Sequence, residues 1–321
     1  MNHRLLGRTG LKVSEIGYGA WGIGAKQWIG ASDDESARAL HRTIDLGLNF
    51  IDTALAYGDG HSERIVGQVV RSRKEKVYVA TKVPPKNRRW PASGTADDAF
   101  PGDYLTKCTE ESLKNLGLET IDLQQLHVWT DDFIGQGDWL AAAESLKKQG
   151  KIRFFGISLG EHTPDNGIRA VESGAIDTVQ VIYNIFDQSP EDRLFPACRT
   201  HNVGVLARVP LDEGGLTGKL TLETTYPKDD FRNGYFKGDR KREVVERVAR
   251  IAEDLGIAME EMAETSIRFT LSHPAVSSVI PGMRSVRHAE ANCGSGDGKG
   301  LAARRLDALR KHRWVRNYYK S

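Results

Sequence analysis

The regular alternation of short apolar runs with amphipathic stretches is the feature that most constrains the fold of this chain. Runs rich in valine, isoleucine and phenylalanine predict buried strands, and apolar residues at three- and four-residue steps predict helices. The predicted strands cover residues 13–19, 49–53, 77–82, 121–127, 153–158, 178–182, 204–209 and 277–280. The predicted helices cover residues 33–45, 103–116, 140–149, 165–173, 191–200, 243–255 and 301–312.

Alternating strands and helices predict parallel strands that are joined by crossover helices. Eight strands are the number that closes a (β/α)8 TIM barrel, so we predict an α/β barrel that forms a single domain over residues 1–321. The alternative is a doubly wound open sheet, which should carry the spacing G-x-G-x-x-G after its first strand. Residues 19–24 (GAWGIG) have a different spacing, which disfavours the open sheet.

Three segments outside this alternation complete the expected architecture. Residues 5–13, which turn at residues 8–10, predict an N-terminal β-hairpin that caps the barrel floor. Residues 83–102 and 212–242 are too long for simple connections, and long loops in compact domains are usually functional or mobile. Both segments follow predicted strands, so we expect long loops at the C-terminal face of the barrel.

Composition and charge exclude several classes of protein. With 321 residues, of which 39% are hydrophobic, the chain can bury a large core. The net charge of +2 provides no field that would favour nucleic acid or an anionic membrane. No segment approaches the roughly 20 apolar residues of a membrane span, and the N-terminus lacks an apolar signal segment. We therefore expect neither a nucleic-acid partner nor a membrane partner.

The cysteines indicate a reducing compartment. Cys108, Cys198 and Cys293 are far apart and show no CxxC or Cys/His spacing, so neither a disulfide framework nor a metal site is predicted. We therefore expect a cytoplasmic protein. The chain has no long heptad run, and so we expect a monomer or a weak homodimer.

Four ionisable residues lie at or just beyond the ends of three successive predicted strands. Asp52 lies at the end of the second strand, Lys82 ends the third, and His127 ends the fourth. Tyr57 follows in the loop after the second strand. Catalytic groups of a barrel project from the C-terminal ends of strands, so these side chains are expected to converge. Each alone has a commoner structural role, such as helix capping or packing, but the four together favour an active site.

These residue types suit proton transfer to a carbonyl oxygen. A tyrosine has a pKa of about 10, which is too high for ready proton loss at neutral pH. A neighbouring ammonium lowers that pKa, and a carboxylate keeps the ammonium charged and oriented. A histidine beside the phenol can donate to an oxyanion or relay a proton. The set therefore predicts that Tyr57 is a general acid that acts as negative charge develops on a carbonyl oxygen.

Six segments in the same order resemble the aldo-keto reductase family over nearly the whole chain. They are D-T-A-x-x-Y-G-x-G-x-S-E at residues 52–63, T-K-V at 81–83, D-L-x-x-x-H at 122–127, K-I-R-x-x-G-x-S at 151–158, Q-x-x-Y-N at 180–184 and I-P-G-x-x-S at 280–285. The resemblance implies that the protein reduces an aldehyde or ketone to an alcohol with NADPH, or catalyses the reverse oxidation. NADH is the less expected cofactor.

Residue roles follow from the same resemblance. Tyr57 would donate the proton, Lys82 and Asp52 would adjust its pKa, and His127 would orient the substrate or relay the proton. Residues 213–219 (EGGLTGK) fit a loop over the cofactor pyrophosphate, with backbone amides facing the phosphates. The residues expected to contact the cofactor are Gly19, Ala20, Trp21, Asp52, Ser158, Gln180, Arg208, Pro210, Leu211, Gly214, Leu216, Lys219, Gly282, Arg284, His288 and Asn292.

Two residues depart from the family pattern, and one role of the family has three candidate residues here. Leu159 stands where the family often has asparagine, so one contact to the nicotinamide carboxamide is missing or replaced. Arg208 stands where a tyrosine stacks on the nicotinamide, and a guanidinium plane can also stack on an aromatic ring. A basic residue of the family binds the adenosine 2′-phosphate, and Arg284, Arg287 or His288 could take this role.

Two other functions fit part of this pattern. A regulatory module that senses a nicotinamide cofactor would bind it with little turnover. A barrel lyase or isomerase would need a metal cluster or phosphate site that the sequence does not show. The expected substrate is a small carbonyl compound or alcohol, and the candidate walls of its pocket are Trp21, Trp90, Trp129, Trp314, Tyr318 and Tyr319.

Overall fold

Eight parallel strands lie side by side in chain order in the computed structural model, which describes residues 1–160 and 163–314. Their residues are nearly all buried, as is usual for parallel strands that helices cover. The strands are β3 (Tyr18–Gly19), β4 (Phe50–Asp52), β5 (Tyr78–Val83), β6 (Ile121–Leu126), β7 (Ile152–Ser158), β8 (Thr178–Ile182), β9 (Gly204–Arg208) and β10 (Val276–Val279).

The first and last strands of this sheet meet and close it. The amide of Gly17 donates to the carbonyl oxygen of Val279 at 2.8 Å, and the amide of Gly19 donates to that of Pro281 at 3.0 Å. Parallel bridges pair Ile16 with Val279 and Gly19 with Gly282. The predicted (β/α)8 barrel is confirmed, and the open doubly wound sheet is wrong.

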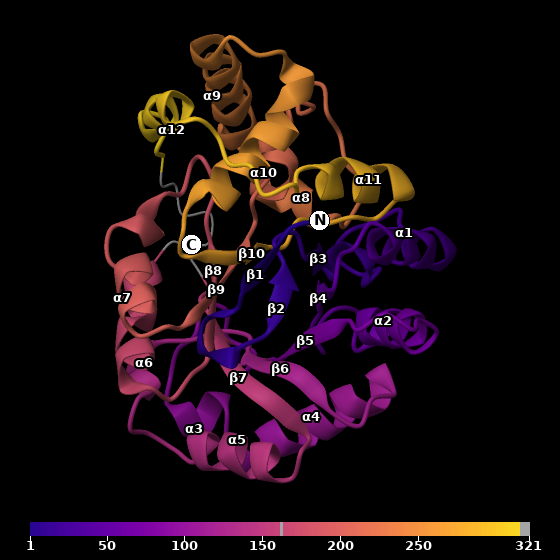
Figure 1. Cartoon of the computed structure of the whole chain (residues 1–321), viewed down its shortest axis with the longest axis vertical. Coiled ribbons are helices and arrows are strands. Elements are labelled where there is room, and N and C mark those ends of the chain that lie inside the picture. The colour runs from indigo at the N-terminus through magenta and orange to yellow at the C-terminus, as the bar shows by residue number, and fades with distance from the viewer. Residues whose placement is uncertain (161–162, 315–321) are drawn as a thin grey trace.

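Helices surround the strands on all sides (Figure 1). They are α1 (Asp33–Asp45), α2 (His61–Arg71), α3 (Ala96–Ala99), α4 (Gly102–Leu116), α5 (Trp139–Lys148), α6 (Ile168–Ser173), α7 (Leu194–Thr200), α8 (Phe231–Tyr235), α9 (Arg240–Leu255), α10 (Met262–Ser272), α11 (Val286–Gly294) and α12 (Ala303–Arg310). Helices α2, α3, α8, α10 and α11 were not among those predicted. In α2 the cause is its composition, because Ile65, Val66 and Val69 favour a strand at least as much as a helix.

An antiparallel hairpin formed by β1 (His3–Leu5) and β2 (Lys12–Ser14) covers one end of the barrel. Its residues Leu6, Leu11 and Val13 pack against Phe50 and Tyr78, near the starts of two barrel strands. The hairpin is confirmed, but the single strand predicted over residues 13–19 is wrong. That run is divided between β2 of the hairpin and β3 of the barrel. The sequence does not reveal such a division, because residues on both sides of it are buried.

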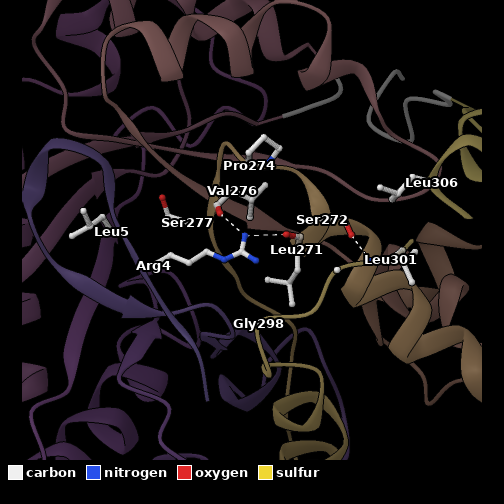
Figure 2. Close-up of a pocket in the computed structure, with 11 residues that line it drawn as sticks. Arg4, Leu5, Leu271, Ser272, Pro274, Val276, Ser277, Gly298, Leu301 and Leu306 are labelled. Carbon is white, nitrogen blue, oxygen red and sulfur yellow. Dashed lines mark hydrogen bonds between the residues drawn. The ribbon is translucent and has the colours of Figure 1, made fainter. Parts of the chain in front are cut away.

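The barrel floor is held together by Arg4 of the hairpin. Its Nε atom donates to Glu15 at 3.0 Å, and its Nη1 atom donates to the carbonyl oxygens of Leu271 and Val276 at 2.9 and 3.0 Å. Its Nη2 atom lies 2.9 Å from Glu15. A crevice of about 510 Å³ lies beside these contacts (Figure 2). Every nitrogen of the guanidinium group is therefore used by the floor itself.

The two long loops lie after β5 and β9, at the opposite end of the barrel from the hairpin. The first contains α3, and the second contains a 3-10 segment over Asp212–Thr217 and α8. Within the described ranges, no helix combines the length and apolar character that crossing a membrane requires.

Candidate active site

Asp52, Lys82, Tyr57 and His127 come together at the C-terminal rim of the barrel. The Nζ atom of Lys82 lies 2.5 Å from Oδ2 of Asp52 and donates to the carbonyl oxygen of Thr53 at 2.8 Å. It also donates to the phenol oxygen of Tyr57 at 3.3 Å. Both members of the Lys82–Asp52 pair are buried. The lysine therefore links the carboxylate to the phenol, as the sequence pattern predicts.

Tyr57 and His127 are half-buried and lie next to each other. Their ring centroids are 5.4 Å apart, with the rings nearly perpendicular. The Nδ1 atom of His127 has no hydrogen-bond partner among residues 1–160 and 163–314. The phenol and the imidazole are thus placed to share one small polar group, such as a carbonyl oxygen.

Burial changes the expected electrostatics of Tyr57. Desolvation raises the pKa of Tyr57, and the lowering effect of the Lys82 ammonium does not outweigh it. The expectation of a lowered phenol pKa is therefore corrected for the protein without cofactor or substrate. A phenol that keeps its proton at neutral pH is still in the form that a proton donor requires.

The pKa values of Lys82 and His127 are shifted in opposite directions. Burial alone would lower the pKa of Lys82, but Asp52 and Tyr57 outweigh burial, so the pKa is raised and the lysine stays charged. Burial, together with the positive charges of Lys82 and Arg208, lowers the pKa of His127 well below its ordinary value. The imidazole is therefore neutral at physiological pH and suits hydrogen bonding better than proton supply.

Asp52 is also held by two amides. Gln180 and Gln125 donate through their Nε2 atoms to Oδ1 of Asp52, at 2.8 and 3.1 Å. Gln125 was not predicted as a site residue, although it lies two positions before His127 in the same strand segment. Because both oxygens of Asp52 accept hydrogen bonds, its orientation toward Lys82 is fixed.

A groove of about 410 Å³ runs from Asp52 and Tyr57 along the ends of β3, β9 and β10. Most of the predicted cofactor residues line it: Gly19, Ala20, Trp21, Asp52, Gln180, Arg208, Pro210, Leu211, Gly214, Lys219, Gly282, Arg284, His288 and Asn292. Ser158 and Leu216 are buried and are not among the lining residues. Arg287 is exposed and is also not part of the lining.

Basic residues gather in one part of this groove. Burial lowers the pKa of His288, and the positive charges of Arg287, Lys219 and Arg284 lower it further. The guanidinium carbon of Arg284 lies 5.3 Å from the ring centroid of Trp28, and its Nη1 atom donates to the carbonyl oxygen of Ile29 at 3.0 Å. A groove with cations at one part and amides and a phenol at another fits an elongated anionic cofactor.

Several lining residues were not named among the predicted cofactor contacts, including Trp28, Glu213 and Arg232, although Glu213 lies in the loop predicted over the pyrophosphate. The guanidinium of Arg232 stacks on Trp28 at 4.5 Å and pairs with Asp230 at 2.8 Å. Burial raises the pKa of Glu213 to about 7. All three lie in loops or in a short loop helix, where neither periodicity nor strand position marks a residue as functional.

The two departures from the family pattern, Leu159 and Arg208, are in contact. The Nη2 atom of Arg208 donates to the carbonyl oxygens of Leu159 and Gly160, at 3.0 and 2.5 Å. Arg208 therefore ties the end of β9 to the chain that leaves β7. The apolar side chain of Leu159 can form no hydrogen bond, so the contact between these two positions uses the backbone of Leu159.

The candidate pocket walls divide into two groups. Trp21 and Trp90 flank the reaction centre, with ring centroids 6.3 Å from Tyr57 and 4.7 Å from His127, respectively. Trp129 is buried against Phe133 and Trp139, and Trp314 packs on Phe186. Tyr318 and Tyr319 lie outside the described residues.

Residues 15–313 match the sequence model of the Aldo/keto reductase family. The chain belongs to this family. It is 30% identical to the uncharacterized oxidoreductase YqkF of Bacillus subtilis over 97% of this chain and 96% of that protein. The holo form of aldo-keto reductase AKR11C1 from Bacillus halodurans superposes with a TM-score of 0.77 at 26% identity, covering 100% of this chain and 99% of that one.

Two further relatives differ in the cofactor that their names state. Aldo-keto reductase yakc [NADP(+)] of Schizosaccharomyces pombe is 30% identical over 88% of this chain and 84% of that protein. The NADH-specific methylglyoxal reductase of Escherichia coli is 32% identical over 68% of this chain and 70% of that protein. As a member of the family, this protein is an NAD(P)H-dependent carbonyl reductase.

Proposed function

We propose that the protein reduces an aldehyde or ketone to an alcohol with NADPH, reversibly, and that Tyr57 donates the proton. The observation that carries this proposal is the Lys82 ammonium, which contacts Asp52 and the phenol of Tyr57 at the same time. The phenol also lines the groove that fits the cofactor. A small-molecule substrate, a monomeric or weakly dimeric state and a cytoplasmic location are parts of the same proposal.

The proposed chemistry uses the four residues in separate roles. When bound, the nicotinamide supplies a hydride to the carbonyl carbon. The Tyr57 hydroxyl donates its proton to the carbonyl oxygen as negative charge develops there. Lys82 stabilises the phenolate that remains, and Asp52 keeps Lys82 charged and aimed. Neutral His127 orients the carbonyl oxygen by hydrogen bonding.

The residues that would hold the cofactor follow from the lining of the groove. Gln180, with Ser158 as a second candidate, would hold the nicotinamide amide near Asp52, and the loop at 213–219 would lie along the pyrophosphate. Arg284 and His288 would bind the adenosine 2′-phosphate. We infer a preference for NADPH because the cations Arg284 and Lys219 lie with the imidazole of His288 around one part of the groove.

Tryptophan fluorescence titration with NADPH and NADH tests the cofactor assignment directly. Arg284→Ala should weaken NADPH binding about tenfold, because it removes one charge-assisted contact, and should leave NADH binding nearly unchanged. Arg287→Ala is the matched control, since this arginine is exposed outside the lining. Equal affinity of the native protein for both cofactors, or equal effects of the two variants, would contradict the assignment.

A panel of carbonyl compounds with NADPH then separates an enzyme from a sensor. Turnover with at least one aldehyde or ketone is expected. Tight cofactor binding without turnover of any panel member would favour the cofactor-sensing module instead. Absence of nicotinamide binding would favour a barrel lyase or isomerase.

A further inference from the structure

The first turn of α2 carries two fully buried polar side chains behind the reaction centre. Ser62 and Glu63 each have 0% of their surface exposed, and neither is among the residues that line the groove. Buried polar groups lower stability unless they form hydrogen bonds. The partners of Ser62 and Glu63 therefore show which parts of the protein they hold.

Ser62 connects three segments around the reaction centre. Its hydroxyl donates to the carbonyl oxygen of Ala20 at 2.9 Å and lies 2.8 Å from the hydroxyl of Thr53. Because a hydroxyl carries one proton, Thr53 must be the donor in the second bond. The backbone carbonyl of Thr53 accepts from Lys82, and the amide of Ser62 donates to the carbonyl of Tyr57 at 3.2 Å.

Glu63 holds the strand that carries Lys82. Its Oε1 atom accepts from the hydroxyl of Thr81 at 2.6 Å, and its Oε2 atom accepts from Asn115 at 2.9 Å. Burial raises the pKa of Glu63, and the hydrogen bonds from Thr81 and Asn115 oppose this rise. Successive side chains of a strand point to opposite faces, so Thr81 faces α2 while Lys82 points into the barrel.

We propose that Ser62 and Glu63 are positioning residues that set the distance between the Lys82 ammonium and the Tyr57 phenol. The proposal rests on the proposed function of Tyr57 as proton donor. The Lys82–Tyr57 contact of 3.3 Å is long for a hydrogen bond. Ser62 contacts the backbone of Tyr57 and the side chain of Thr53, whose carbonyl accepts from Lys82, and Glu63 holds the strand of Lys82 through Thr81. A small displacement of either segment would weaken the effect of the ammonium on the phenol.

Threonine substitutions test each connection without changing side-chain shape. Thr53→Val removes the donor to Ser62, and Thr81→Val removes the donor to Glu63. We expect each to lower kcat about 10- to 100-fold, the range in which misplaced catalytic groups reduce turnover. The pH midpoint of alcohol oxidation should move upward, because a more distant Lys82 lowers the pKa of Tyr57 less. Thr53→Ser and Thr81→Ser keep the hydroxyls and should restore both values.

Thr43→Val is the matched structural control. Thr43 is a buried threonine of α1 whose hydroxyl donates to the carbonyl of Leu40 at 2.8 Å. Its loss should lower thermal stability but leave kcat and the pH midpoint unchanged. If Thr53→Val does not fold, Ser62→Ala tests the same Thr53–Ser62 connection, because it removes only the oxygen atom that accepts from Thr53.

A titration without turnover separates this proposal from the proposed function. The ultraviolet difference between each protein and its Tyr57→Phe counterpart reports ionisation of Tyr57 alone. If the native protein reduces no carbonyl compound, the proposed function fails, and the phenol titration still tests the positioning. The proposal is overturned if Thr53→Val and Thr81→Val leave the Tyr57 midpoint where Thr43→Val leaves it.

Discussion

The floor and the rim of the barrel each contain an ion pair with a buried carboxylate, and the two pairs differ in whether a member also contacts a group that faces a groove. At the floor, Glu15 accepts from Arg4, from Asn2 at 3.0 Å and from the amide of Gly298 at 2.7 Å. Each nitrogen of Arg4 in turn has a partner within the floor. At the rim, Lys82 donates to a phenol that lines an open groove.

The same interaction therefore serves two purposes. A charge pair whose hydrogen bonds all end within the protein adds to a stable scaffold. A charge pair that also contacts a group facing a groove can act on a ligand. This division agrees with the general behaviour of TIM barrels, in which the C-terminal face carries the chemistry and the N-terminal face carries stability. The predictions below test this division.

Tyr57→Phe is expected to have the largest effect. The substitution removes the proton that the site would deliver and leaves the ring in place, so kcat should fall by roughly 10²- to 10⁴-fold. Cofactor affinity and thermal stability should change little. NADPH oxidation with a good aldehyde substrate and a binding titration measure the two quantities. A variant that keeps most of its activity would show that the phenol is structural.

Lys82→Met should reduce turnover in the same direction, because the phenolate loses its stabilising charge. The double variant with Tyr57→Phe should lose far less activity than the product of the two single effects, since both residues act as one unit. Steady-state kinetics on all four proteins give the coupling. Independent, multiplicative effects would mean that Lys82 does not act through Tyr57.

Arg4→Met should lower stability and leave turnover nearly unchanged, whereas the rim variants should lower turnover. It leaves the carboxylate of Glu15, which has 0% exposure, without its charge partner, and so should lower the free energy of unfolding by about 3 kcal/mol. Turnover per folded molecule should stay within about twofold of the native value. Denaturant unfolding and kinetics below the transition measure both.

Arg8→Met, at an exposed turn of the same hairpin, is the control and should change stability by less than about 0.5 kcal/mol. A floor variant that loses turnover while keeping its stability would contradict the division.

Glu213→Gln should have the smallest effect, on the pH dependence of cofactor binding. Glu213 lines the groove among Arg208, Asp212, Arg232 and Arg240, and its pKa is raised to about 7. A raised carboxyl pKa means that negative charge appears as pH rises through about 7, where it repels an anionic cofactor. Affinity for NADH, which lacks the titrating 2′-phosphate, should fall a few-fold between pH 6 and pH 8 in the native protein. The glutamine variant should show no such fall; the same slope in both proteins would exclude Glu213 as its cause.

Much of the fold and part of the site could be predicted from local sequence. The strands at residues 121–127, 178–182 and 204–209 agree with β6, β8 and β9 because their apolar runs are short, buried and bounded by turns. The helix at 33–45 agrees with α1 because its apolar face repeats at helical spacing and Ser32 caps its first turn. Local pattern could not reveal α2, whose valines and isoleucine suit either structure.

The sequence by itself determined which ionisable groups meet at the rim. Parallel strands that alternate with helices must present all their carboxyl ends at one face, so Asp52, Lys82 and His127 converge whatever the details of packing. Only the tertiary structure decided that residues 13–19 serve two sheets, that Arg208 donates to the carbonyl oxygen of Leu159, and that burial raises the pKa of Tyr57. The physical reason is the range of the interactions. Periodicity and strand order act between neighbours in the chain, whereas desolvation and side-chain hydrogen bonds depend on residues that meet only after the barrel has closed.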